Sequence, residues 1–269
     1  MSTFPGLRSA AGPTVAPASE TPVRREACAV EGLPKVSNVY AAEQYRVLGH
    51  VVQQLGKSEK RVIAISSPVA GDGKTTTCIN LASTLSHSPG CRVLLIDADL
   101  RRGTLGEQLG LGRPTGPGLA GAIADESIAL ETVVRRRPGL SFAVLPAGTC
   151  PGMPYEALRS SRMDEILKAA RQSFDYVLVD TPPVVPVADL LALSDWVDGI
   201  FLVVSAHQTP RGLLDEALSS MDPAKVVGII YNGDDLPLLN RHRAYYSYGE
   251  RGSAPRRSPS ILAAPPNRP

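Results

Sequence analysis

A glycine-containing turn at residues 66–77 is the part of this sequence best suited to chemistry on a phosphate group. It follows a short apolar run at 62–65 and leads into a helix-like run at 78–82. A turn between a buried strand and a helix start points backbone N–H groups outward, and these bind phosphate together with the positive end of the helix dipole. Lys74 can reach the outer phosphates, and the Thr75 hydroxyl can bind Mg²⁺. We expect phosphate contacts from Ala70, Gly71, Asp72, Gly73, Lys74, Thr75 and Thr76.

The turn departs from the strict P-loop pattern G-x-x-x-x-G-K-[ST] at one position. Pro68 stands where the first glycine is expected, so we interpret the turn as a variant P-loop. The simpler interpretation is an ordinary glycine turn before a helix. That interpretation is weakened because Gly73, Lys74 and Thr75 all keep their register after a strand-like run.

Carboxylates at the ends of two further apolar runs provide groups that a phosphate site needs beside the turn. Asp97 and Asp99 end one run, and Asp180 ends another in the form of a Walker B motif. In such sites carboxylates hold Mg²⁺, usually through water, and accept a proton from the attacking group. A spacing of two would place Asp97 and Asp99 on the same side if the strand continued. The alternatives are a capped strand end and, for Asp180, a turn-starting residue before proline.

An arginine pair, Arg101 and Arg102, directly follows the first two acids. These guanidinium groups can neutralise phosphate charge. An adjacent pair of arginines is more often a solvated surface feature, however, and we favour that interpretation.

Three of the eight tyrosines lie within four residues near the end of the chain, at Tyr245, Tyr246 and Tyr248. Their segment shows no strand alternation, contains arginines and leads into a proline-rich stretch. Exposed tyrosines on a flexible segment can accept phosphate, and each phosphate would add about −1.5 to −2 charges. The alternative is that these aromatic side chains pack on a sheet edge, and composition alone does not separate the two.

The composition of the chain excludes several classes of function. A net charge of +2 over 269 residues, with 5% aromatic residues, does not indicate a nucleic-acid-binding protein. The four cysteines are scattered without a C-x-x-C pair, so we expect reduced thiols and no metal cluster. No apolar run approaches the roughly 18–20 residues of a membrane span, and no secretory leader is visible. We therefore expect a cytoplasmic protein that reaches the membrane only through a partner.

The pattern of apolar runs predicts an α/β fold, a three-layer sandwich of the P-loop NTPase type. Short runs rich in Val, Ile and Leu alternate with helical patterns, which indicates a mostly parallel sheet covered by helices on both faces. Ligands bind beyond the carboxyl ends of the strands in such folds, and the turn and the acids lie there. We expect strands at 62–65, 93–96, 142–145, 177–179, 200–204 and 226–230, and helices at 39–56, 75–87, 119–124, 155–173, 186–194 and 211–221.

We expect one folded domain with a segment on each side. Residues 1–37 are rich in Pro, Ala, Ser, Thr and Gly without an apolar period, and we expect them to be disordered. The folded domain covers 38–236 and begins with the helix at 39–56. Residues 237–269 contain the tyrosine cluster and a basic, proline-rich stretch, and we expect a flexible tail.

Over about residues 39–233 the sequence resembles the bacterial tyrosine kinases that govern capsule and exopolysaccharide production. The P-loop variant is followed by a stretch at 93–105, VLLIDADLRRGTL, which matches the family's Walker A′ motif. Further matches follow in the family's order at 145–148, 154–158, 179–183, 187–199 and 226–232. The tyrosine cluster falls where the family keeps its autophosphorylation sites.

The resemblance implies a function for each candidate residue. Lys74 and Thr75 would bind the phosphates of ATP and Mg²⁺, and Asp97 and Asp180 would organise the metal. Asp99 or Asp97 would orient or deprotonate the acceptor tyrosine, with the division of work among the three aspartates left open. The family implies that the tyrosine cluster of one chain enters the active site of a neighbour.

The resemblance also implies partners. A membrane-embedded polysaccharide co-polymerase, the chain-length determinant, would activate the kinase as a separate protein and recruit it to the inner face of the cell membrane. A cognate phosphotyrosine phosphatase would reverse the reaction, and no nucleic acid is expected.

Two positions depart from the family pattern. Glu43 and Arg46 match the oligomerisation pattern E-x-x-R-x-x-R, but its last position is Gly49, which leaves the formation of a homo-oligomeric ring open. Ala70 stands where the family's P-loop usually has proline before its glycine.

Two other functions remain open on the sequence. One is a ParA/MinD-like ATPase switch, although those relatives have an extra lysine early in the P-loop where this chain has Val69. The other is a nucleotide-binding pseudokinase that interacts with a polysaccharide co-polymerase, an interpretation suggested by the short tyrosine cluster and by Gly49.

Overall fold

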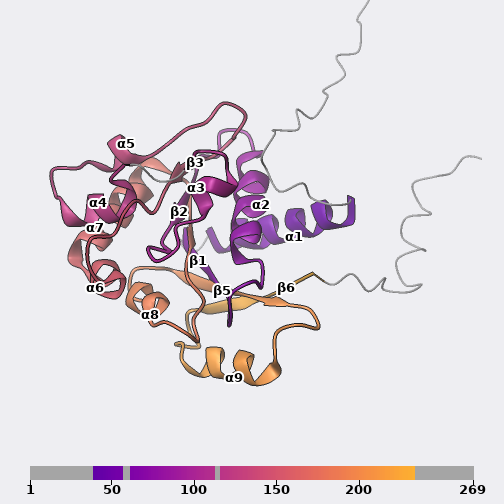
Figure 1. Ribbon diagram of the computed structural model, residues 1–269. Coiled ribbons are helices and arrows are strands. Elements are labelled where there is room, and N and C mark those ends of the chain that lie inside the picture. The colour runs from indigo at the N-terminus through magenta and orange to yellow at the C-terminus, as the bar shows by residue number, and fades with distance from the viewer. Residues whose placement is uncertain (1–38, 57–60, 113–115, 234–269) are drawn as a thin grey trace, which may run out of the picture.

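Helices and strands alternate along most of the chain (Figure 1). The computed structural model describes residues 39–56, 61–112 and 116–233, so the two expected disordered segments and the tyrosine cluster lie outside the described residues. The strands are β1 (Val62–Ser66), β2 (Val93–Asp97), β3 (Ala143–Leu145), β4 (Tyr176–Asp180), β5 (Gly199–Ser205) and β6 (Val226–Asn232). The helices are α1 (Val39–Gly56), α2 (Lys74–Ser86), α3 (Leu105–Gln108), α4 (Gly118–Ala124), α5 (Leu130–Val133), α6 (Pro154–Arg159), α7 (Ser161–Ser173), α8 (Asp189–Leu193) and α9 (Arg211–Ser219). Among the described helices, none is both long and apolar enough to cross a membrane.

The six strands form one sheet in the order β3-β2-β4-β1-β5-β6, and all neighbouring strands are parallel. The expected α/β fold is therefore confirmed. Because the strands are parallel, their carboxyl ends lie at one edge of the sheet. The P-loop after β1 and the acids at the ends of β2 and β4 consequently meet at that edge.

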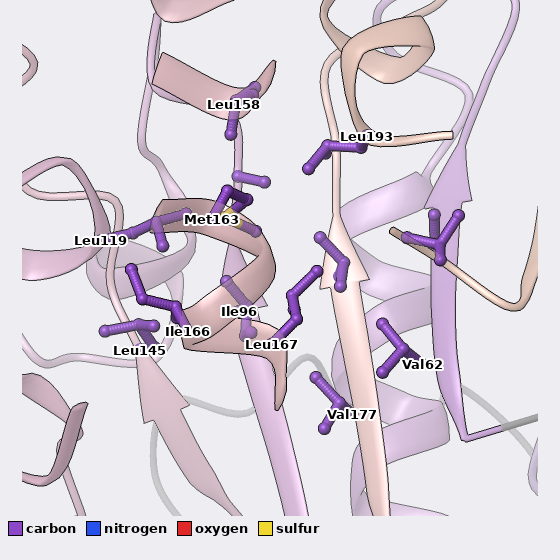
Figure 2. Packing of buried hydrophobic residues seen from close by; sticks show 14 of the residues in the cluster. Val62, Ile96, Leu119, Leu145, Leu158, Met163, Ile166, Leu167, Val177 and Leu193 are labelled. Carbon is purple, nitrogen blue, oxygen red and sulfur yellow. The ribbon is translucent and has the colours of Figure 1, made fainter. Parts of the chain in front are cut away.

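The side chains of the strands alternate between two hydrophobic cores, one on each face of the sheet. Val62 and Ala64 of β1 face the larger core, which α4 to α9 cover, whereas Ile63 and Ile65 face the core under α1, α2 and α3. Figure 2 shows the larger core, where side chains from the strands and from α7 pack together. Burial on both faces explains why β1, β2, β3 and β5 are continuous apolar runs.

The helix expected at 155–173 is in fact two helices, α6 and α7, which meet at Ser160. Ser160 has an extended backbone (φ −64°, ψ 153°), and its hydroxyl accepts a hydrogen bond from the Met163 N–H. This is an N-cap, the position that serine favours. The expected helix at 186–194 is also shorter, because residues 181–188 form a loop and α8 begins only at Asp189.

The helix expected at 39–56 is confirmed as α1, and it packs closely on α2. Gly49 is buried at this contact, and a Cβ atom there would lie 3.1 Å from Thr84 Cγ2. Glu43 and Arg46 form an ion pair on the exposed side of α1. An arginine at position 49 would thus point into α2 rather than beside Arg46, while the proposed oligomerisation through Glu43 and Arg46 stays a prediction.

The two edges of the sheet differ. At the β3 edge, Arg135 and Val144 exchange backbone hydrogen bonds of 2.7 and 2.9 Å in an antiparallel bridge. At the other edge, β6 pairs only with β5 within the described part of the chain. The β6 side chains Ile229 and Tyr231 are 48% and 59% exposed, so this edge is open.

Candidate active site

The P-loop connects the carboxyl end of β1 to the first residue of α2, Lys74. Gly71 and Gly73 adopt φ angles of 95° and 92°, a region that side chains with a Cβ atom rarely enter. Gly73 is the N-cap of α2, and its carbonyl accepts the Thr77 N–H at 2.9 Å. The loop therefore has the strand–turn–helix context that a phosphate-binding P-loop requires.

The side chain of Asp72 braces the loop from inside. Its Oδ1 accepts the Thr209 hydroxyl at 2.6 Å, and its Oδ2 accepts the Val69 N–H at 3.2 Å. The Asp72 carbonyl accepts the side-chain amide of Asn232 at 2.9 Å. A contact of Asp72 with nucleotide phosphate, which the sequence predicts, would therefore involve its backbone N–H and not its carboxylate.

Thr209 and Asn232 were missed by the sequence reasoning, although both contact the P-loop. Thr209 precedes α9, and Asn232 ends β6. The Asn232 amide lies so close to Gly73 that a Cβ atom at Gly73 would be 2.0 Å from it. The N-G dipeptide at 232–233 indicates only a turn, and nothing in the local pattern points to the P-loop.

Asp97 and Asp180 end adjacent strands at paired positions. They are register partners in β2 and β4, and both are buried. Asp97 accepts the N–H groups of Asp99 and Leu105 at 3.2 and 3.1 Å. Asp180 Oδ1 is buried without a hydrogen-bond partner among the described residues. An orphaned carboxylate oxygen of this kind is suited to a ligand or cation that the structure does not contain.

The spacing of two predicts that Asp99 continues the strand after Asp97. In the structure Asp99 instead lies in a turn, close to the P-loop residue Lys74. β2 ends at Asp97, and the turn is closed by a 2.7 Å hydrogen bond from the Gly103 N–H to the Asp99 carbonyl. The Asp99 carboxylate lies 4.0 Å from Lys74 Nζ. The structure thus brings the candidate lysine close to Asp99, beside the paired strand ends that carry Asp97 and Asp180.

Burial raises the pKa values of Asp97 and Asp180. It raises the pKa of Asp97 to about 8, and the charges of Asp180 and then Asp99 add to this increase. Burial also raises the pKa of Asp180 to about 6, against the opposing effects of the Lys74 charge and the Thr75 hydroxyl. The adjacent Cys78 thiol is neutral because burial raises its pKa well above the usual value. Near neutral pH the two aspartates therefore share about one proton.

The donor set fits a Mg²⁺ ion that is completed by phosphate oxygens. Within the described chain no group of three or more His, Cys, Asp or Glu side chains converges on a metal position. Magnesium characteristically uses one or two carboxylates together with substrate phosphates and water. Thr75 and Asp180 lie close enough for the Thr75 hydroxyl to lower the pKa of Asp180, and the orphaned Asp180 oxygen is available.

Arg101 and Arg102 behave differently from each other. Arg101 is 43% exposed, as expected of a surface arginine, but it also forms an ion pair with the fully buried Asp189. Arg102 is exposed, as expected. Asp189 was not recognised as a site residue from the sequence, since it lies 88 residues away from its partner.

A cavity of about 330 Å³ lies beside the site rather than in it. Gly106, which follows the Leu105 N–H donor to Asp97, lies on its wall. The basic side of the cavity is formed by Arg135, Arg136 and Arg137. Because the P-loop residues do not line this cavity, it is not the phosphate site.

Comparison with known proteins agrees with the fold. The AAA domain family model matches residues 60–209. Tyrosine-protein kinase YwqD of Bacillus subtilis is 33% identical over 214 residues, which cover 78% of this chain and 87% of YwqD. Succinoglycan biosynthesis transport protein ExoP of Rhizobium meliloti is 36% identical over 195 residues, which cover 71% of this chain and 24% of ExoP. The solved BceF tyrosine kinase domain is 34% identical with a TM-score of 0.64, covering 72% of this chain and 77% of that domain.

With this motif series and fold, and relatives matched over most of their length, the chain belongs to the bacterial tyrosine kinase family. Its P-loop domain implies nucleotide binding. The chain spans about a quarter of the length of ExoP and of the long EpsB relatives from Ralstonia.

Proposed function

We propose that this chain is an ATP-dependent protein-tyrosine kinase that phosphorylates its own C-terminal tyrosine cluster and regulates exopolysaccharide or capsule biosynthesis and export. The observation that supports this most directly is the approach of Lys74 to Asp99, beside the paired strand ends that carry Asp97 and Asp180. A cation for the phosphates and a carboxylate for the acceptor hydroxyl are the two groups that phosphoryl transfer needs.

Each side chain has a definite task in this mechanism. Lys74 and the P-loop N–H groups bind the β- and γ-phosphates of ATP. Asp99, whose carboxylate lies 4.0 Å from Lys74 Nζ, accepts the proton of the incoming tyrosine hydroxyl. The bond between the γ-phosphorus and the ADP oxygen breaks as the bond to the tyrosine oxygen forms.

Mg²⁺ would be held by Thr75 and Asp180, next to Asp97 on the neighbouring strand. When bound, it would neutralise charge on the phosphate oxygens. A proton is shared by Asp97 and Asp180 near neutral pH, so occupation by a cation would favour its release. This leaves Asp99 as the proposed proton acceptor, because Asp180 would hold the cation and Asp97 is buried and already accepts two backbone N–H groups.

The proposed partners follow from the relatives. One of them, ExoP, has a name that describes transport in succinoglycan biosynthesis. We infer that the present chain acts at the inner face of the membrane with a separate polysaccharide co-polymerase, as a cytoplasmic protein, and that a phosphotyrosine phosphatase reverses its modification. Assembly into a homo-oligomer through α1 belongs to the same proposal.

The test is phosphotyrosine formation by the purified chain with ATP and Mg²⁺, detected by mass spectrometry. We expect phosphate on Tyr245, Tyr246 or Tyr248, none in Lys74→Met, and a large loss with retained ATP binding when all three tyrosines are replaced by phenylalanine. The assay is repeated with the cytoplasmic segment of a co-polymerase partner. If neither condition gives more phosphotyrosine than Lys74→Met, the chain is a nucleotide-binding pseudokinase instead.

A further inference from the structure

A bidentate ion pair joins the two loops that carry the candidate carboxylates. Arg101 Nε donates to Asp189 Oδ2 at 2.7 Å, and Arg101 Nη2 donates to Asp189 Oδ1 at 2.9 Å. The Asp189 side chain is fully buried, whereas that of Arg101 is 43% exposed. The parallel fork of two charge-assisted hydrogen bonds fixes orientation as well as distance.

On one side, the pair restrains the turn that presents Asp99. Arg101 lies in the middle of this turn, which is closed by hydrogen bonds from Arg102 and Gly103 back to Asp99. The Arg102 N–H also binds the Asp99 carboxylate at 3.1 Å. The position of the Asp99 carboxylate relative to Lys74 therefore depends on where this turn is held.

On the other side, the pair restrains the segment that runs from Asp180 to α8. Two hydrogen bonds attach this segment to the end of β1 and the start of the P-loop. The Thr181 N–H donates to the Ile65 carbonyl at 3.1 Å, and the Val184 N–H donates to the Ser67 carbonyl at 2.9 Å. Asp189 is the first residue of α8, at the end of the attached segment. Arg101 consequently connects the Asp99 turn to a segment that is itself hydrogen-bonded to the residues before the P-loop.

We propose that Arg101 and Asp189 are positioning residues for phosphoryl transfer. Their contact holds the Asp99 carboxylate near Lys74 and keeps the Asp99 turn in a fixed position relative to the strand ends that carry Asp97 and Asp180. The first test below measures phosphotyrosine formation and therefore rests on the kinase function proposed above. The second test measures nucleotide binding and does not.

The first experiment compares Arg101→Met and Arg101→Lys with the wild-type chain. Loss of a side chain that orients ligand groups typically lowers activity by about 10- to 100-fold. We expect Arg101→Met to lower kcat for phosphotyrosine formation at saturating ATP by about this factor, with KM for ATP rising by no more than the roughly tenfold loss of Mg²⁺-dependent affinity described below. Arg101→Lys keeps the charge but not the fork, and we expect it to recover only a small part of kcat. An unchanged kcat in Arg101→Met, or full recovery in Arg101→Lys, would overturn the proposal.

The chain offers a matched control at the opposite end of the same two strands. Arg92 and Asp175 directly precede β2 and β4, and they also form a bidentate pair, with contacts of 3.3 and 3.1 Å. This pair lies away from the carboxyl ends of the strands. We expect Arg92→Met to leave kcat unchanged, and an equal loss in Arg92→Met and Arg101→Met would count against a positioning role.

A double variant separates positioning from simple stabilisation. Arg101→Met alone leaves the buried Asp189 charge without a partner, which lowers stability. Combining it with Asp189→Leu removes that charge, and we expect the thermal midpoint to recover while kcat stays low. Recovery of kcat together with the thermal midpoint would show that the pair only stabilises the fold and would overturn the proposal.

The second readout does not need kinase activity. Affinity for a non-hydrolysable ATP analogue is measured by calorimetry with and without Mg²⁺. We expect Arg101→Met to reduce the enhancement by Mg²⁺ about tenfold while affinity without Mg²⁺ stays near the wild-type value. If the wild-type chain forms no phosphotyrosine, the kinase proposal fails, and an unchanged Mg²⁺ enhancement in the variant is then the result that overturns the positioning role.

Discussion

Replacing Asp97 with asparagine should alter how the stability of the ligand-free protein depends on pH. The pKa of Asp97 rises from 3.8 to about 8 on folding, mainly because the carboxyl is buried. The folded protein therefore binds this proton more tightly than the unfolded chain. The resulting stabilisation is fully present below pH 3.8 and is lost as the pH rises through about 8.

The size of the effect follows from these two pKa values. Integrated between pH 6 and pH 8, the difference in proton binding corresponds to about 2 kcal/mol of unfolding free energy that the wild-type protein loses. Asp180 has a pKa of about 6 in the folded protein, so most of its contribution is already lost by pH 6. We therefore expect Asp97→Asn to show a nearly constant unfolding free energy over the range in which the wild-type value falls.

Urea unfolding at pH 6, 7 and 8, without nucleotide or Mg²⁺, measures this directly. The slope with pH is compared rather than the absolute stability, because an asparagine amide opposite the Leu105 N–H costs stability at every pH. Asp215→Asn, an exposed carboxyl on α9, is the control and should keep the wild-type slope. A fall of about 2 kcal/mol in Asp97→Asn, or its absence in the wild-type protein, would refute the reasoning.

Three further substitutions test the site and the core. Gly73→Ala should abolish ATP binding, measured by calorimetry, because φ is 92° and the new Cβ would lie 2.0 Å from the Asn232 amide. Thr209→Val should weaken ATP binding and lower stability by about 1–3 kcal/mol, since it removes the 2.6 Å hydrogen bond to Asp72; unfolding and nucleotide titrations check both. Leu94→Ala, at a fully buried β2 position, should lower the unfolding free energy by about 2–5 kcal/mol in urea.

The strands, the P-loop and its acids could be predicted because their signals are local. Each described strand is an apolar run, β2 and β4 end in an aspartate, and Lys74 and Thr75 follow the second P-loop glycine in sequence. The turn at Asp99 could not be predicted from such a local signal. Pairing with β4 continues only to the Ala98 N–H, and the chain then turns at Gly103, where φ is 55°.

The contacts that brace the site could not be predicted because they depend on strand order. Asp72 binds Thr209 and Asn232 across separations of 137 and 160 residues. The insertion of β4 between β1 and β2 brings Arg101 to Asp189, and no periodicity in the sequence specifies that insertion. The assignments to the tyrosine cluster and to oligomerisation through α1 remain predictions.

The unequal edges of the sheet have a consequence for the behaviour of the protein in concentrated solution. Unpaired N–H and carbonyl groups along an edge strand are a template for a strand from another molecule. The β3 edge is partly protected by the bridge at Arg135, whereas β6 presents Ile229 and Tyr231 on a side that no other described strand pairs. Self-association of unfolding or overexpressed chains would therefore begin at β6, and a lysine at position 229 is the substitution that would best improve solubility there.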